Sequence, residues 1–148
     1  MACPYFYPTT PLALGYWGKR ARLPLGDLFA GVCHADPLEP FDPDEDRLRE
    51  CCNLGYARGC CPRFPDGPGP DAVRFVVSAD ENGSLRIAFA VEHDYRPGEC
   101  GALDFDRARQ ALASPPLNPL LARQAEAYAS SYLRRKPARQ AAAAGDGR

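Results

Sequence analysis

Two adjacent cysteine pairs in one short segment restrict this chain more than any other feature. The segment reads CCNLGYARGCC and spans residues 51–61. Seven cysteines occur among the 148 residues, at positions 3, 33, 51, 52, 60, 61 and 100. The chain also has 16 prolines and 13 glycines, which predicts much irregular loop that apolar packing alone would hold poorly. Thiols that meet at one site could fasten such loops together.

The N-terminal segment and the apolar content predict a soluble, cytoplasmic protein. The opening MACPYFYPTTPL has neither the charged start nor the apolar run of a secretion signal. No stretch approaches the roughly 18 apolar residues of a membrane span. In a reducing compartment, clustered thiols bind metal or carry redox chemistry more often than they form disulfides. A net charge of −1 makes the whole molecule no obvious nucleic-acid binder.

The sequence predicts one α+β domain over residues 1–136, built from two parts. Residues 1–66 form a cysteine-rich lobe of loops and short helix. Residues 71–136 form an antiparallel β-hairpin of two to three strands, followed by a C-terminal helix. The segment PDGPGPD between the two parts is rich in residues that break regular structure. Residues 137–148 are expected to be a disordered tail.

The hairpin is predicted by alternation and by its turn. VRFVVSA and LRIAFAVEH alternate apolar residues with residues of mixed polarity, and the turn between them contains Asn82-Gly83. An Asn-Gly pair between alternating runs is the strongest short signal for a hairpin. One apolar face should therefore cover a core, and residues 101–106 are a candidate third strand.

Two helices are expected, and their ends carry the usual signals. Asn118 and Pro119 open the C-terminal helix, which has an apolar stripe at helical spacing and is expected to end at Lys136–Pro137. In the cysteine-rich part, Asp42 is expected to cap a shorter helix that stops near Gly55. The second residue of the first cysteine pair would then lie near the end of that helix.

Four cysteines are the predicted ligands of one metal centre. Neighbouring cysteines on a helix point about 100° apart, so a compact site should take one from each pair. We favour Cys52 at the end of the short helix and Cys61, which precedes Pro62. Cys3 and Cys33 would complete the site and tie the N-terminus, the middle loop and the helix end together. The reserve candidates are Cys51, Cys60 and Cys100.

Four thiolates suit either Zn²⁺ or a [4Fe–4S] cluster. The chain has no C-x₂₋₄-C knuckle, which zinc sites usually contain. Widely spaced ligands among aromatic residues favour a large cofactor that needs a dry shell. That shell could come from Tyr5, Phe6, Tyr7, Tyr56 and Phe64. The sequence therefore predicts a small iron–sulfur protein with an electron-transfer, redox-sensing or structural role and an unidentified redox or protein partner.

Two other functions stay open. A zinc-stabilised module could bind protein or nucleic acid through the basic end of the C-terminal helix or through a loop around Trp17 that contains Lys19, Arg20 and Arg22. A thiol-based redox protein could use either cysteine pair. The chain contains no G-x-S-x-G, H-E-x-x-H or G-x-G-x-x-G motif, so we predict no catalytic centre.

The first part of the chain resembles a group of small uncharacterised bacterial proteins with four cysteines. The shared motifs are CPYFYP, LPLGDLFAGVC and CCNLGYARGCCPRFP. The resemblance covers most of residues 1–66 and implies a cluster site held by the same four cysteines. It implies nothing about a substrate.

Overall fold

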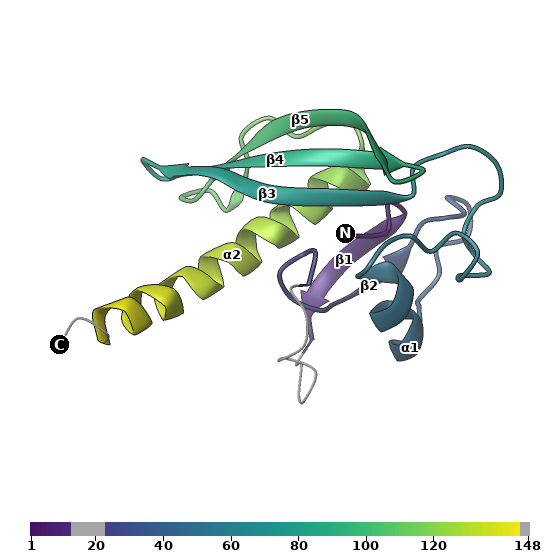
Figure 1. Ribbon diagram of the computed structural model, residues 1–148, viewed down its shortest axis with the longest axis horizontal. Coiled ribbons are helices and arrows are strands. Elements are labelled where there is room, and N and C mark those ends of the chain that lie inside the picture. The colour runs from purple at the N-terminus through teal and green to yellow at the C-terminus, as the bar shows by residue number, and fades with distance from the viewer. Residues whose placement is uncertain (13–22, 146–148) are drawn as a thin grey trace.

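The computed structural model describes residues 1–12 and 23–145, with side chains described up to residue 135. It has two antiparallel sheets and a long helix (Figure 1), which confirms the predicted α+β class. The four-stranded sheet has the order β3-β4-β5-β6, with β3 at Ala72–Glu81, β4 at Ser84–His93, β5 at Arg96–Asp106 and β6 at Ala111–Leu112. The second sheet pairs β1, Phe6–Pro11, with β2, Phe29–Cys33.

The predicted hairpin is β3 and β4. Asn82 and Gly83 have positive φ angles of 53° and 77°, which are the left-handed conformations that a two-residue hairpin turn requires. Phe75 lies opposite Phe89 across the two strands, and Leu85 and Ile87 of the apolar face are fully buried. The third strand is longer than expected, because β5 runs through Arg96–Asp106, and β6 was not predicted.

Helix α2, Pro119–Gly145, lies across one face of the four-stranded sheet and beside β1 (Figure 1). Its start is confirmed, because the Asn118 side chain accepts hydrogen bonds from the backbone N–H groups of Leu120 and Leu121. The end predicted at Lys136–Pro137 is wrong, since the helix continues to Gly145. Proline costs a helix about 3 kcal/mol, but the residues after it are mainly alanine, the strongest helix former. Disorder over 137–148 stays a prediction.

The short helix begins later than the sequence suggests. Asp44, not Asp42, caps α1, Glu45–Arg47, by accepting a hydrogen bond from the Arg47 N–H at 2.8 Å. The helix begins late because the backbone of Phe41 is hydrogen-bonded to Cys33, which keeps the chain extended before α1. A π-helical turn, η2, follows over Leu48–Cys52.

The two parts of the chain share one cluster of buried apolar side chains. Ala2 forms an isolated β-bridge with Val73, so the N-terminal segment adds to the edge of the large sheet. Gly55 permits this approach. Its φ is +78°, and a side chain there would bring a Cβ within 2.9 Å of the Met1 carbonyl oxygen. The same buried cluster includes Cys3 and Cys52 together with residues of β3, β4, β5 and α2.

Candidate metal centre

Five cysteines line a single cavity, which we call the cysteine cavity. They come from three parts of the chain that are far apart: the N-terminus, the end of β2, and the segment 51–61, which contributes cysteines from η2 and from the loop directly after it. The five are Cys3, Cys33, Cys51, Cys52 and Cys61. All four residues predicted as ligands are therefore among those that the fold brings together. Their role as ligands stays a prediction.

Cys3 is held in place by hydrogen bonds to both its backbone N–H and its carbonyl oxygen. Its N–H donates to the Cys52 carbonyl oxygen at 3.1 Å. Its carbonyl oxygen accepts a hydrogen bond from the side-chain amide of Gln124 at 2.8 Å, and the same amide donates to Phe6 at 2.7 Å. Gln124 is fully buried, so this side chain of α2 holds the backbone of Cys3 and Phe6 in place. A polar residue within an apolar helical stripe is the sequence signal for such a contact.

Cys33 lies at the last position of β2, where two backbone pairings meet. Across the sheet it lies opposite Phe6 of β1. On its other side it exchanges two hydrogen bonds with Phe41, of 2.7 and 3.0 Å. The backbone of this cysteine is therefore held by β1 on one side and by the isolated bridge to Phe41 on the other.

Cys51 and Cys52 lie together on η2, and both line the cavity. The sequence predicted that only one cysteine of each pair would be a ligand, and the choice between these two stays a prediction. A π-helical turn has more residues per turn than an α-helix, so neighbouring side chains point in more similar directions. Asn53, which is fully buried, ties this turn to β2 by bonding both backbone groups of Phe29.

Cys61 reaches the cavity from a tight turn, whereas Cys60 does not. The N–H groups of Cys60 and Cys61 both donate to the Ala57 carbonyl oxygen, at 2.9 and 2.8 Å. Cys61 is half-buried and Cys60 is exposed. Cys100 is exposed on β5, opposite Ala90. Of the three reserve candidates, only the one on η2 lines the cavity.

The remaining wall of the cavity is mostly apolar. Tyr5, Phe6 and Phe64 line it, and the rings of Tyr5 and Phe64 meet edge to face with centroids 5.4 Å apart. The other two aromatic residues expected in the shell lie elsewhere. Tyr7 packs against His34, and Tyr56 stacks on Tyr95.

Two arginines complete the lining, and sequence reasoning did not identify them. Arg47 and Arg63 both face the cavity, and both guanidinium groups lie over the ring of Phe41, at 5.3 and 3.6 Å from its centroid. No spacing pattern signals this arrangement, because Phe41 lies in an isolated bridge, Arg47 in α1 and Arg63 in a turn after η2, and they meet only after folding.

Burial keeps the deepest thiols protonated. Burial, with smaller contributions from the neighbouring cysteines at 33, 61 and 51, raises the pKa of Cys3 to about 12. Burial also raises the pKa of Cys52 and of Cys51, again with contributions from nearby cysteines. These thiols are therefore weak nucleophiles at neutral pH, and they would become thiolates only when a cation replaces their protons.

The cavity is small, at about 20 Å³, which is room for about one water molecule. Within the part of the chain that the structure describes, no three or more His, Cys, Asp or Glu side chains are grouped so that they could hold a metal ion. The thiols thus surround a space without forming a finished single-ion site. Side chains on the wall would have to turn inward, or the wall would have to widen, to bind a guest.

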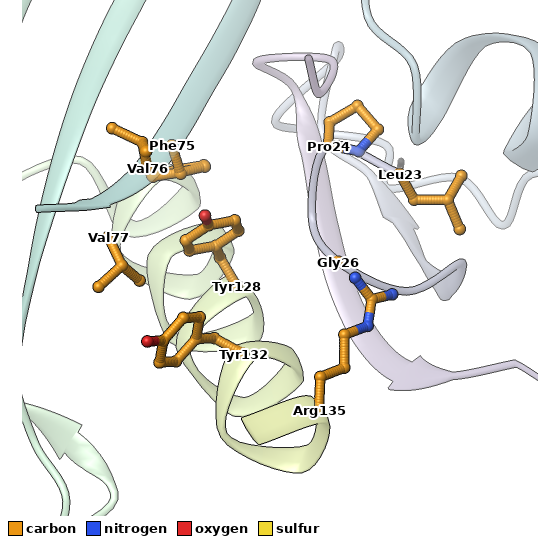
Figure 2. A pocket seen from close by; sticks show the side chains of 9 residues that line it. All are labelled: Leu23, Pro24, Gly26, Phe75, Val76, Val77, Tyr128, Tyr132 and Arg135. Atoms are coloured by element: carbon orange, nitrogen blue, oxygen red, sulfur yellow. The ribbon is translucent and has the colours of Figure 1, made fainter. Parts of the chain in front are cut away.

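Two other cavities contain no thiol. One, of about 470 Å³, lies between α2, β3 and residues 23–26 (Figure 2). Tyr128 and Tyr132 project from α2 toward β3, and the Tyr128 ring stacks on Phe75. The other, of about 500 Å³, lies at the start of α2 and shares Tyr5 with the cysteine cavity.

The basic segments proposed for binding protein or nucleic acid give this function no added support. The loop around Trp17, with Lys19, Arg20 and Arg22, lies outside the described residues. Where the sequence predicted the end of the helix, Arg134 and Arg135 lie within α2 and both pair with Asp27.

Fold and cavity together define a class: a small, cysteine-rich α+β protein in which thiols from distant segments surround an apolar cavity. No family model, curated protein or solved structure matches the chain. Among the described residues, no helix combines the length and the apolar content needed to span a membrane. The function is therefore inferred from the residues of the site.

Proposed function

We propose that this protein holds a [4Fe–4S] cluster through Cys3, Cys33, Cys52 and Cys61 and serves in electron transfer, redox sensing or structural support. One observation carries the proposal: cysteines from three distant parts of the chain line the same cavity. Thiolates are the soft ligands that iron–sulfur clusters and zinc require. A loop-rich lobe also has a reason to bind metal, because structural metal binding can contribute about 10–16 kcal/mol to folding.

The residues fit a thiolate-bound centre in their donor chemistry. Aromatic side chains cover the cavity and would keep water from the sulfur ligands, which is one of the factors that set a cluster's potential. A bound cluster supplies one-electron redox chemistry. With a cysteine on every iron it would have no open position, so the protein's own part is to hold the group, shield it and allow electrons to pass.

Zinc bound to the same thiols is the second candidate, and the size of the cavity favours it. A space of about 20 Å³ suits one ion better than a core of eight atoms, which would need the wall to move outward. In that case the metal is structural, and the protein is an interaction module. A thiol-based redox function is less well supported, because burial raises the pKa values of Cys3, Cys51 and Cys52 and leaves these thiols unreactive.

Anaerobic purification followed by metal and sulfide analysis tests the proposal. A cluster gives a brown protein with broad visible absorption and matching amounts of iron and sulfide, whereas a zinc protein is colourless. Cys3→Ser and Cys52→Ser should each abolish binding of the metal, while Cys60→Ser and Cys100→Ser serve as matched controls outside the cavity and should not. Wild-type protein that holds neither iron nor zinc would overturn both candidates.

A further inference from the structure

Arg47 and Arg63 line the cysteine cavity without a carboxylate partner. Other arginines of the protein, such as Arg58 and Arg74, form ion pairs with Asp71 and Glu92. Neither cavity arginine forms one with any described residue. A guanidinium group keeps its charge in almost any environment and is weakly hydrated, so it suits a position beside buried sulfur. Arg47 is half-buried and Arg63 is exposed at the outer edge of the cavity. Two positive charges at the edge of a thiol-lined space would favour an anion inside it.

Both arginines pack against one platform, the ring of Phe41, and the backbone of Phe41 is hydrogen-bonded to the predicted ligand Cys33. The Phe41 ring lies 3.6 Å from the Arg63 guanidinium carbon and 5.3 Å from that of Arg47. The backbone of Phe41 exchanges two hydrogen bonds with Cys33. Cation–π contacts of this kind stabilise a charged group without neutralising it. The platform therefore fixes the two charges relative to the cysteine at the end of β2.

We propose that Arg47 and Arg63 are the counter-charges of the metal–thiolate centre, which strengthen metal binding and raise the reduction potential of a bound cluster. This inference rests on the proposed function. Four thiolates around Zn²⁺, or around an oxidised [4Fe–4S] core, carry a double negative charge, and the two guanidinium groups balance it. A cluster becomes more negative when it accepts an electron, so nearby positive charge stabilises the reduced state more than the oxidised one.

Charge-removing variants test the inference with two readouts. We expect Arg47→Gln combined with Arg63→Gln to weaken Zn²⁺ binding by the metal-free protein about tenfold or more in a chelator competition. The midpoint potential of the reconstituted cluster should become more negative, and each single variant should show part of both effects. Arg63→Lys keeps the charge and should retain most of the wild-type behaviour. Arg86→Gln removes an equal charge from an exposed position, where Arg86 pairs with Asp104, and should change neither readout.

The outcomes separate this inference from the function on which it rests. Wild-type protein that binds neither Zn²⁺ nor a cluster would overturn both. Normal binding in the wild type with an unchanged affinity and potential in the double variant would overturn only the role of the arginines. That role is equally overturned if Arg86→Gln produces an equal shift, or if Arg63→Lys behaves like Arg63→Gln, because the effect must depend on both position and charge. Urea unfolding of each metal-free variant will show whether its fold is intact.

Discussion

Replacing Asn53 by alanine should destabilise the fold and open the cysteine cavity, because one side chain joins η2 to β2. The Asn53 Oδ1 accepts a hydrogen bond from the Phe29 N–H at 3.0 Å, and its Nδ2 donates to the carbonyl oxygens of Phe29 at 3.1 Å and Leu48 at 2.9 Å. Asn53 is fully buried, and Phe29 is almost so. Water therefore cannot take over these bonds in the variant.

The loss in the free energy of unfolding comes from the buried backbone groups that lose their hydrogen-bond partner. Pro11 lies opposite Phe29 in the β1–β2 sheet and has no N–H to offer the Phe29 carbonyl. Leu48 keeps one donor, since its carbonyl also accepts from the backbone N–H of Asn53 at 3.1 Å. Each unsatisfied buried group costs about 1–3 kcal/mol, so the two Phe29 groups together predict a loss of about 3 kcal/mol in the free energy of unfolding.

Urea unfolding of the metal-free protein measures this loss, and a thiol reagent added under native conditions measures the opening of the cavity. Ser78→Ala is the control, because Ser78 makes a single exposed hydrogen bond to the carbonyl oxygen of Arg86 and should cost less than about 0.5 kcal/mol. If Asn53→Ala costs no more than this control and labels no faster, the claim that this amide joins the two elements is refuted.

Two further perturbations follow from the contacts of α2. Gln124→Ala removes the donor to the carbonyl oxygens of Cys3 and Phe6. It should lower the free energy of unfolding by about 2 kcal/mol and speed labelling of the Cys3 thiol; an unchanged labelling rate at that position would contradict it. Burial acts to raise the pKa of Asp27, but hydrogen bonds from Arg134 and Ser131 outweigh it and leave that pKa below its ordinary value. This contribution to stability is present above about pH 4 and is lost as the pH falls through the lowered pKa. Asp27→Asn should therefore be less stable than wild type at neutral pH, with the difference shrinking in acid, and a difference independent of pH would count against the ion pair.

If the cavity holds the metal, the exposed cysteines have a different role from the buried ones. Cys60 and Cys100 are exposed and lie outside the cavity, so oxidation of these thiols need not affect a bound metal. Of the cysteines inside the cavity, Cys3 and Cys52 belong to the shared buried cluster. Loss of metal from them should therefore be felt as loss of stability in the lobe.

The sequence alone predicted the elements that depend on neighbours in the chain. Alternating residues and Asn82-Gly83 were sufficient for the β3–β4 hairpin, because its turn and register are local. Asn118 and Pro119 were sufficient for the start of α2, since a cap acts within one turn. The choice of four cysteines for one site combined thiol chemistry with the helical spacing of adjacent cysteines, and the fold does bring all four to one cavity.

Only the tertiary structure decided how the cysteine-rich part is built. The pairing of β1 with β2 joins segments that are not adjacent in the chain, and neither strand has a turn signal that would predict its partner. The π-helical turn that points Cys51 as well as Cys52 at the cavity is not encoded by a spacing rule. Arg47 and Arg63 both contact the ring of Phe41, and backbone hydrogen bonds between Phe41 and Cys33 set the position of that ring. Long-range contacts of this kind depend on which surfaces are buried together, and a local sequence pattern does not specify that.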